Sequence, residues 1–198
     1  MTRKLLYLAK LAKDVHKYRI EQGMFKTNHI QFDEMETFEH TVHKPVSIAI
    51  AVCSHTGHII DTSVATMKAH NRGAPASLGK YGYREDTRDA AREDVLLAIG
   101  KVKHKFSTII TDKNPHYLSD FSRLLPGDKL IQVKAAGRNK ELRRNLDDSL
   151  WQINHVCAKL RSDLARLTRR TWTTTKRTWM LQASLDLYMA YNNGYKLI

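Results

Sequence analysis

The order of the short apolar runs gives the strongest indication of the fold. Residues 29–35, 45–52 and 58–67 are rich in β-branched or small apolar residues, and polar turns such as Ser54–Gly57 separate them. Runs of this kind predict antiparallel strands that follow one another in a meander. The middle run, with its small and β-branched residues, is typical of a central strand.

The second half of the chain alternates between helix and strand. The periodicity predicts a helix over residues 87–104, a buried strand over 105–112, a short helix over 116–125 and a strand over 129–134. Three antiparallel strands followed by such an alternation predict an α/β fold. We expect a mixed five-stranded sheet, with three antiparallel strands and then parallel ones, flanked by helices on both faces.

Helices are also expected at both ends of the chain. Residues 1–24 repeat apolar side chains at helical spacing up to Gly23, and residues 149–170 and 177–193 do the same. The polar stretches 68–86 and 135–148 are expected to be connections. We expect residues 1–27 to form an N-terminal helix and residues 28–198 to form one domain.

The charge balance indicates the class of partner. The chain has 33 Lys and Arg against 20 Asp and Glu, a net charge of +13, which favours a polyanion and above all nucleic acid. No apolar run approaches the roughly 18 residues of a membrane span, so no membrane partner is expected. Cys53 and Cys157 lie in apolar contexts and are expected to be buried, reduced thiols.

Two aspartates lie where strands meet a polar segment. Asp33 is on the first predicted strand and Asp112 ends the fourth. If these strands are neighbours, the carboxylates converge and repel each other unless a cation such as Mg²⁺ neutralises them. Beside a nucleic acid, the matching chemistry is two-metal phosphoryl transfer, with ions about 3.5–4 Å apart. The alternative is that Asp33 is a solvated acid and Asp112 a strand-end cap.

Three motifs resemble a known family. They are FDEMETF (residues 32–38), TDKNPHY (residues 111–117) and INHVCAKLRSDLARLTRRTWTTTK (residues 153–176). In order and separation they resemble the catalytic core of bacterial insertion-sequence transposases, which belong to the ribonuclease H-like, retroviral-integrase superfamily. The resemblance covers about residues 28–193. It implies that residues 28–198 form the catalytic domain and that residues 1–27 are a remnant of a DNA-binding region.

The resemblance implies a set of metal ligands. The family holds two Mg²⁺ or Mn²⁺ ions with two aspartates and a glutamate, or an asparagine in some branches. Carried over, these positions are Asp33, Asp112 and Asn154, and Asn154 departs from the glutamate of many relatives. An amide oxygen can bind Mg²⁺ but brings no charge. Asp147 and Asp148 are alternative third ligands.

The late helix carries a cluster of cations that is expected to bind DNA phosphates rather than only to face solvent. The cluster consists of Arg161, Arg166, Arg169, Arg170, Lys176 and Arg177. His155 either orients a water or phosphate or is a partly buried, hydrogen-bonded histidine. Trp172 and Trp179 are expected to close the core against the last helix, and the alternative is that they stack on a base.

The resemblance implies a transposase that cleaves and joins double-stranded DNA at insertion-sequence ends. It also implies assembly of at least two copies, and a bacterial cytoplasmic location beside the nucleoid. Two other readings remain open. One is a truncated or inactive DNA-binding remnant, because residues 1–27 leave room for one helix where relatives carry a DNA-binding module. The other is a structure-specific ribonuclease H-like nuclease.

Overall fold

A mixed five-stranded sheet forms the centre of the computed structural model, which describes residues 2–70, 73–134, 149–167 and 175–197. Its strands are β1 (Thr27–Phe38), β2 (Pro45–Cys53), β3 (Ile59–Thr66), β4 (Lys103–Thr111) and β5 (Lys129–Gln132). They lie in the order β3-β2-β1-β4-β5, in which β1 to β3 pair antiparallel and β1, β4 and β5 pair parallel. The predicted α/β arrangement, a mixed five-stranded sheet with three antiparallel strands followed by parallel ones, is therefore confirmed.

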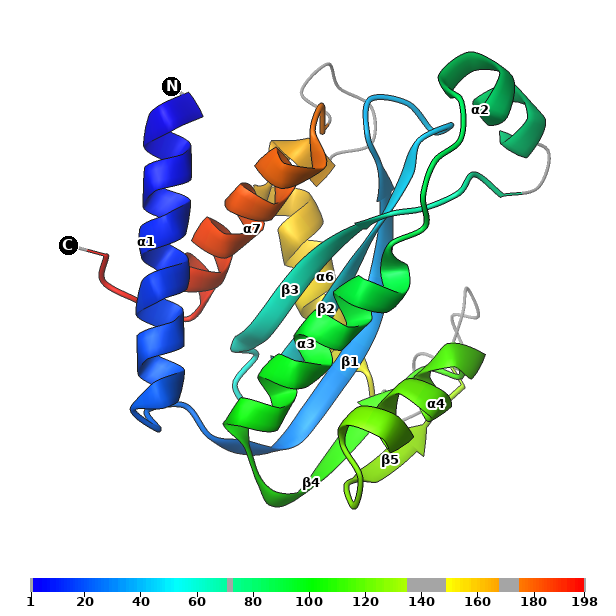
Figure 1. Cartoon of the computed structure of the whole chain (residues 1–198). Coiled ribbons are helices and arrows are strands. Elements are labelled where there is room, and N and C mark those ends of the chain that lie inside the picture. The colour runs from blue at the N-terminus through cyan, green and yellow to red at the C-terminus, as the bar shows by residue number, and fades with distance from the viewer. Residues whose placement is uncertain (1, 71–72, 135–148, 168–174, 198) are drawn as a thin grey trace.

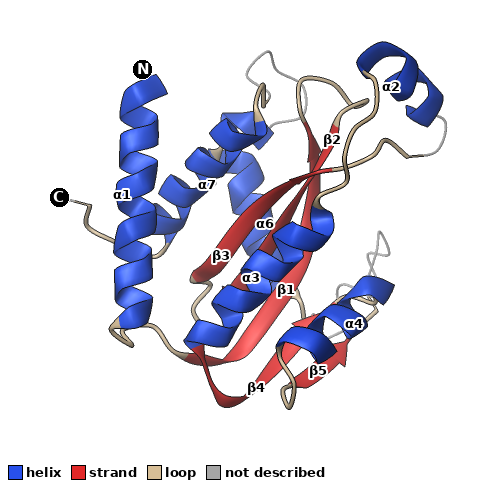
Figure 2. Cartoon of the chain, in the orientation of Figure 1, coloured by secondary structure: helices blue, strands red, loops and turns tan. Residues whose placement is uncertain are grey.

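Helices cover both faces of this sheet (Figure 1, Figure 2). The described helices are α1 (Thr2–Glu21), α2 (Gly73–Tyr81), α3 (Arg88–Val102), α4 (Pro115–Leu124), α6 (Trp151–Asp163) and α7 (Thr178–Asn192). One buried cluster joins α3 and α4 to one face, and a second joins α6 and α7 to the other. α1 packs against α7. No helix within the described ranges has the length and hydrophobicity needed to cross a membrane.

The two cores follow from the alternation of side chains along the strands. On β1, Phe32 points into the cluster beneath α3 and α4, while Met35 points into the cluster beneath α6 and α7. On β2, Ala49 belongs to the cluster beneath α3 and α4, and Ile50 belongs to the cluster beneath α6 and α7. β2 lies between β1 and β3, so its small and β-branched residues are buried on both faces, as predicted.

Side chains from the C-terminal region cover the outer edge of β3. The Gln182 amide accepts from the Val64 N–H at 3.0 Å and donates to the Thr62 carbonyl at 2.9 Å. The Asn193 amide does the same at Ile59, with distances of 2.8 Å in both directions. These amides take the place of a further strand and fix α7 to the sheet.

The stretch 68–86 was predicted to be a long loop, and that prediction was wrong in part. It contains helix α2, in which Ser77 is buried and its hydroxyl donates to the His43 carbonyl at 2.6 Å. α2 buries little apolar surface, so its sequence lacks the apolar stripe by which amphipathic helices are recognised.

The single helix predicted over residues 149–170 was also wrong in its C-terminal part. α6 ends at Asp163, the backbone is extended at Leu164, and a short 3₁₀ helix, η1 (Ala165–Leu167), follows. Leu160 and Leu167 are both buried, so the apolar stripe reaches the core without one continuous helix. The predicted connection 135–148 and residues 168–174 lie outside the described residues.

Candidate functional site

The sheet brings Asp33 and Asp112 to matching positions on neighbouring strands. β1 and β4 pair in parallel, and the last paired positions in their register are Phe32 and Thr111. The next residue along each strand direction is Asp33 on β1 and Asp112 immediately after β4. The expectation that these strands are neighbours is confirmed.

Both aspartates lie on the face of the sheet that α6 covers. Met35 and Ile110, each two residues from one of the aspartates, pack in the cluster beneath α6 and α7. Because side chains alternate along a strand, Asp33 and Asp112 share that face. Each is partly buried, so the pair sits between the sheet and solvent.

The carboxylate of Asp33 is partly buried and lies near two other carboxylates. Its pKa is raised to about 6, chiefly by burial and to a lesser extent by the nearby carboxylates of Asp112 and Glu34. The Glu34 N–H, which donates to Asp33 Oδ1 at 2.8 Å, and the Arg161 guanidinium oppose this shift in pKa. A cation placed between Asp33 and Asp112 would stabilise both charged forms.

The turn that carries Asp112 is held by hydrogen bonds from two sides. The Asn114 N–H donates to Asp112 Oδ1 at 3.1 Å, and Asn114 Oδ1 caps α4 by accepting from the His116 N–H at 3.1 Å. From β5, Gln132 Nε2 donates to the carbonyls of Asp112 and Asn114, both at 3.2 Å. The carboxylate of Asp112 is therefore fixed by the start of α4 and by β5.

No role was predicted for Glu34, which lies on the opposite face of β1. Its carboxylate accepts from Ser47 Oγ at 3.1 Å, from Tyr117 Oη at 3.3 Å and from Asn114 Nδ2 at 3.5 Å, and it lies 3.7 Å from Arg92 Nη1. Glu34 thus joins β1 to the first turn of α4. Its position next to Asp33 in the motif could have marked Glu34 as a residue of the site. Its partners far along the chain could not be foreseen, because they depend on strand register.

Gln31 fastens α6 to β1. Its Nε2 donates to the Ser149 carbonyl at 2.6 Å, and its Oε1 accepts from the Ile153 N–H at 2.7 Å. Gln31 is buried and precedes Asp33 by two residues on the same face of the strand. The start of α6 is therefore held in place relative to Asp33, although no local pattern marks Gln31 as important.

α6 carries Asn154, Cys157 and Arg161 on one side, because residues three and four apart are neighbours on a helix. Burial and the nearby Asp33 raise the pKa of the Cys157 thiol to about 12, and Arg161 opposes that shift. Both Cys157 and Arg161 therefore lie near Asp33. Asn154 is exposed, one turn before Cys157. Cys157 and Cys53 are both free and buried, as predicted.

His155 and Trp151 lie on the solvent side of α6. The alternative of a partly buried His155 is wrong, because this side chain is exposed. Its ring stacks on that of Trp151, with centroids 5.1 Å apart and planes inclined by 7°. Sequence reasoning missed Trp151. The available signal was an aromatic residue on the polar side of a helix whose apolar residues fall on the other side.

The other described members of the predicted DNA-binding cluster lie after α6, in η1 and just before α7. Arg166 lies in η1, Arg177 is the residue before α7, and Lys176 Nζ lies 3.2 Å from His40 Nδ1 in the connection between β1 and β2. Arg161 is the member that lies near Asp33. The predicted residues outside the described ranges are Arg169, Arg170, Asp147, Asp148 and Trp172.

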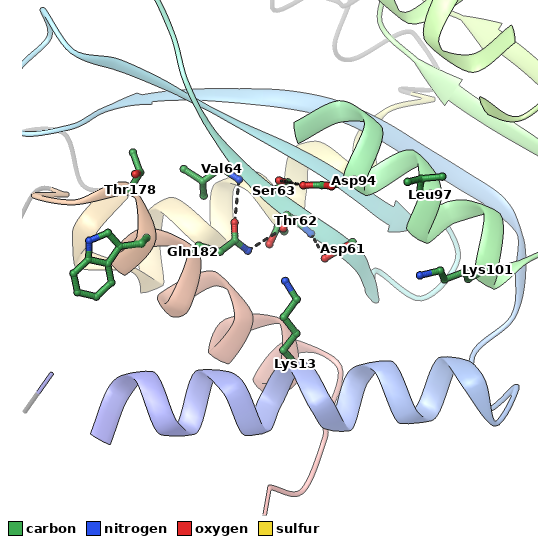
Figure 3. Close-up of a pocket in the computed structure, with 11 residues that line it drawn as sticks. Lys13, Asp61, Thr62, Ser63, Val64, Asp94, Leu97, Lys101, Thr178 and Gln182 are labelled. Carbon is green, nitrogen blue, oxygen red and sulfur yellow. Dashed lines mark hydrogen bonds between the residues drawn. The ribbon is translucent and has the colours of Figure 1, made fainter. Parts of the chain in front are cut away.

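Trp179 corrects another expectation. It was predicted to close the core, but 51% of its surface is exposed, and it lines a cavity of about 570 Å³ beside β3 (Figure 3). In Figure 3 the Lys13 side chain extends toward Asp61 and Gln182. Because β2 lies between β3 and β1, the cavity beside β3 lies away from the Asp33 and Asp112 pair. Its mixture of acids and lysines points to no ligand class.

The Asp33 and Asp112 pair fits a divalent cation with oxygen ligands. Among the described residues, no three His, Cys, Asp or Glu gather closely enough to form a metal site by themselves. An ion bound here would need the Asn154 amide, water or substrate phosphates to complete its coordination, which is the mixture that Mg²⁺ accepts. The raised pKa of Asp33 is the observation that favours such an ion.

Comparisons with known proteins give one structural likeness. No protein-family model matches the chain, and no curated protein matches it. A solved structure of the Mos1 transposase catalytic domain with raltegravir and Mn is similar, with a TM-score of 0.42 and 10% sequence identity over 98% of this chain and 86% of that one. A likeness at this level carries no functional argument, so the site's chemistry must come from its own residues.

Proposed function

We propose that this chain is the catalytic core of a transposase that cleaves and joins double-stranded DNA with the help of Mg²⁺ or Mn²⁺. The observation that carries the proposal is the register of β1 and β4, which sets Asp33 and Asp112 side by side on one face. The raised pKa of Asp33 and the net charge of +13 support it. The proposal includes assembly of at least two copies and a place in the cytoplasm beside the nucleoid.

Each residue of the site has a separate role in the proposed reaction. Asp33 and Asp112 hold the divalent ions, and Asn154 supplies an uncharged oxygen from α6. Ions held there would activate the attacking oxygen and stabilise the leaving oxygen of an in-line displacement. Arg161, which lies near Asp33, binds the phosphate under attack. The other cations of the cluster (Arg166, Arg169, Arg170, Lys176 and Arg177) bind phosphates further along the DNA.

Two displacements then follow. In the first, a water oxygen bonds to the phosphorus at the transposon end, and the bond from phosphorus to the 3′ oxygen breaks, leaving a 3′-hydroxyl. In the second, this hydroxyl attacks a phosphodiester of the target and releases a new 3′-hydroxyl there. Neither step forms a covalent bond to the protein.

Nicking of a supercoiled plasmid in the presence of Mn²⁺ tests the reaction without knowledge of the terminal sequences. We expect Asp112→Asn to abolish nicking, and to remove the heat of Mn²⁺ binding in titration calorimetry, while the thermal unfolding midpoint stays near that of the wild type. Asp14→Asn, at an exposed position of α1, is the matched control and should leave both signals unchanged. Equal nicking by Asp112→Asn and the wild type would rule out the assignment.

One observation favours a second candidate function. Asn154 is exposed and uncharged where many members of the resembled family carry a glutamate, which favours an inactive DNA-binding protein. Tight DNA binding without any Mn²⁺ site in calorimetry would support that function. Preferential cleavage of RNA–DNA hybrids or four-way junctions would instead indicate a structure-specific nuclease built on the same pair of aspartates.

A further inference from the structure

We propose that Trp151 and His155 form a stacking surface for one unpaired base of the DNA substrate, beside the Asp33 and Asp112 pair. The inference rests on the proposed function for its substrate, but base binding and cleavage can be measured separately. The ligand class is a nucleobase in a single-stranded or unpaired segment.

The first step is the exposure of a large aromatic side chain that the fold does not use. Trp151 is 57% exposed at the start of α6, whereas Ile153, Val156 and Leu160 of the same helix are buried. Its ring is already paired with that of His155, which lies nearly parallel to it. Two rings in this arrangement present a flat surface that a third ring can extend.

The second step is that this surface is held rigidly. Gln31 bonds to Ser149 and Ile153, one on each side of Trp151. The backbone at Trp151 is therefore fixed, and an ordered platform loses less entropy when a base binds.

The third step concerns the position of Trp151 relative to the aspartates of the candidate site. Six residues separate Trp151 from Cys157, which lies near Asp33, and this corresponds to about 9 Å along the helix axis. Six residues also turn the helix by about 600°, so Trp151 points about a third of a turn away from Cys157 around α6. The platform therefore borders the candidate site, and a base released from pairing near the cleaved phosphate is its proposed occupant.

The fourth step is the choice of occupant. Every base has a flat π-face, so aromatic platforms beside cationic surfaces bind single strands with little sequence preference. Arg161 on the same helix, and the cationic chain as a whole, favour an occupant that carries phosphates. The other occupant to be tested is an aromatic side chain of a second copy.

Fluorescence of the full chain tests the proposal. The chain has three tryptophans, so Trp172→Phe and Trp179→Phe leave Trp151 as the only indole. In EDTA, a single-stranded oligonucleotide should quench this fluorescence to saturation, and an oligonucleotide of abasic residues should not. Removing the ring with Trp151→Ala should weaken binding of the single strand roughly 5- to 100-fold.

Three variants separate stacking from other effects. Trp151→Phe should retain most of the affinity, His155→Ala should lose part of it, and Trp179→Ala, at a similarly exposed tryptophan, should leave it unchanged. Unchanged affinity in Trp151→Ala would overturn the proposal. Equal quenching by the abasic strand, or quenching that grows with protein concentration alone, would overturn it as well.

The same titration distinguishes this inference from the proposed function. Asp112→Asn should still show the quenching by single strands, because no metal is present. If the stacking signal is absent while Mn²⁺-dependent nicking persists, only the platform is wrong. If the stacking signal persists and nicking never occurs, the proposed reaction is wrong.

Discussion

A carboxylate that folding takes out of water destabilises the protein when it is charged, and Asp33 and Asp61 are both in that position. Burial raises the pKa of both Asp33 and Asp61 to about 6. Asp33 faces a second carboxylate in the candidate site, where a divalent ion would offset the cost. Asp61 lies beside the cavity at β3, near Lys13, and has no proposed catalytic role.

We predict that Asp61→Asn stabilises the protein at neutral pH. The folded state holds the proton of Asp61 more tightly than the unfolded chain, whose aspartate pKa is 3.8, because burial disfavours the charged form. Stability from this group is complete below the lower pKa and is lost as the pH rises toward about 6. The variant should gain about 1–3 kcal/mol in the free energy of unfolding at pH 8 and almost nothing at pH 3.5.

Urea denaturation at the two pH values measures this difference. The asparagine keeps an oxygen for the Thr62 N–H, which donates to Asp61 Oδ1 at 2.8 Å, so the local hydrogen bond survives. Asp14→Asn on the exposed face of α1 serves as the control and should change neither value. An equal gain at both pH values would mean that the effect does not come from titration of Asp61.

At the scale of elements, the first turn of α4 links three strands. Asn114 Oδ1 caps the helix, the Asn114 N–H donates to the Asp112 carboxylate, and Asn114 Nδ2 donates to Glu34 on β1. Gln132 of β5 donates to the carbonyl of Asn114. The position of the Asp112 carboxylate therefore depends on the side chain of Asn114 through two separate contacts. One contact stabilises the helix, and the other ties the turn to β1.

We predict that Asn114→Ala lowers both stability and metal affinity, because it removes the cap and the bond to Glu34. The loss of the cap should cost about 1 kcal/mol in the free energy of unfolding. Asn114→Ser keeps a capping oxygen but is too short to reach Glu34. It should therefore restore the stability while Mn²⁺ affinity, measured by calorimetry, stays several-fold below the wild type. Full recovery of Mn²⁺ affinity in the serine variant would show that only the cap matters.

Local patterns predicted most elements, and contacts far apart in the chain account for the misses. Apolar runs placed every strand of the described residues to within a few residues, and apolar periodicity did the same for α3, α4 and α7, each of which buries one side. It failed for α2, which buries little, and for the end of α6, where the stripe continues through the 3₁₀ turn to Leu167. The hydrogen bonds of Gln31 and Glu34 follow from strand register and helix placement, which no local pattern reports.

For the molecule as a whole, the net charge of +13 implies that the proposed binding to DNA would be largely electrostatic. The expected location of that binding is the side of the sheet that carries α6, because Asp33, Asp112 and Arg161 gather there. Such binding should weaken steeply with salt, since each neutralised phosphate contributes a slope of about −0.9 in log affinity against log salt for duplex DNA.

We predict that Arg161→Gln lowers the magnitude of this salt slope by about 1, because one phosphate contact is removed. Fluorescence anisotropy with a labelled duplex over a range of salt concentrations measures the slope. Lys17→Gln is the matched control, since Lys17 lies on the exposed face of α1 and pairs there with Glu21 at 3.8 Å. An identical slope in Arg161→Gln and the wild type would place the DNA elsewhere on the surface.

The amides of Gln182 and Asn193 also restrict how copies of this chain can meet. They already use the backbone groups through which β3 would otherwise recruit a neighbouring strand. Two protomers therefore cannot merge their sheets at that border unless α7 first detaches. Any assembly that brings two DNA ends together has to form through helix surfaces, through loops or through the short strand at the far border, or be bridged by the DNA itself.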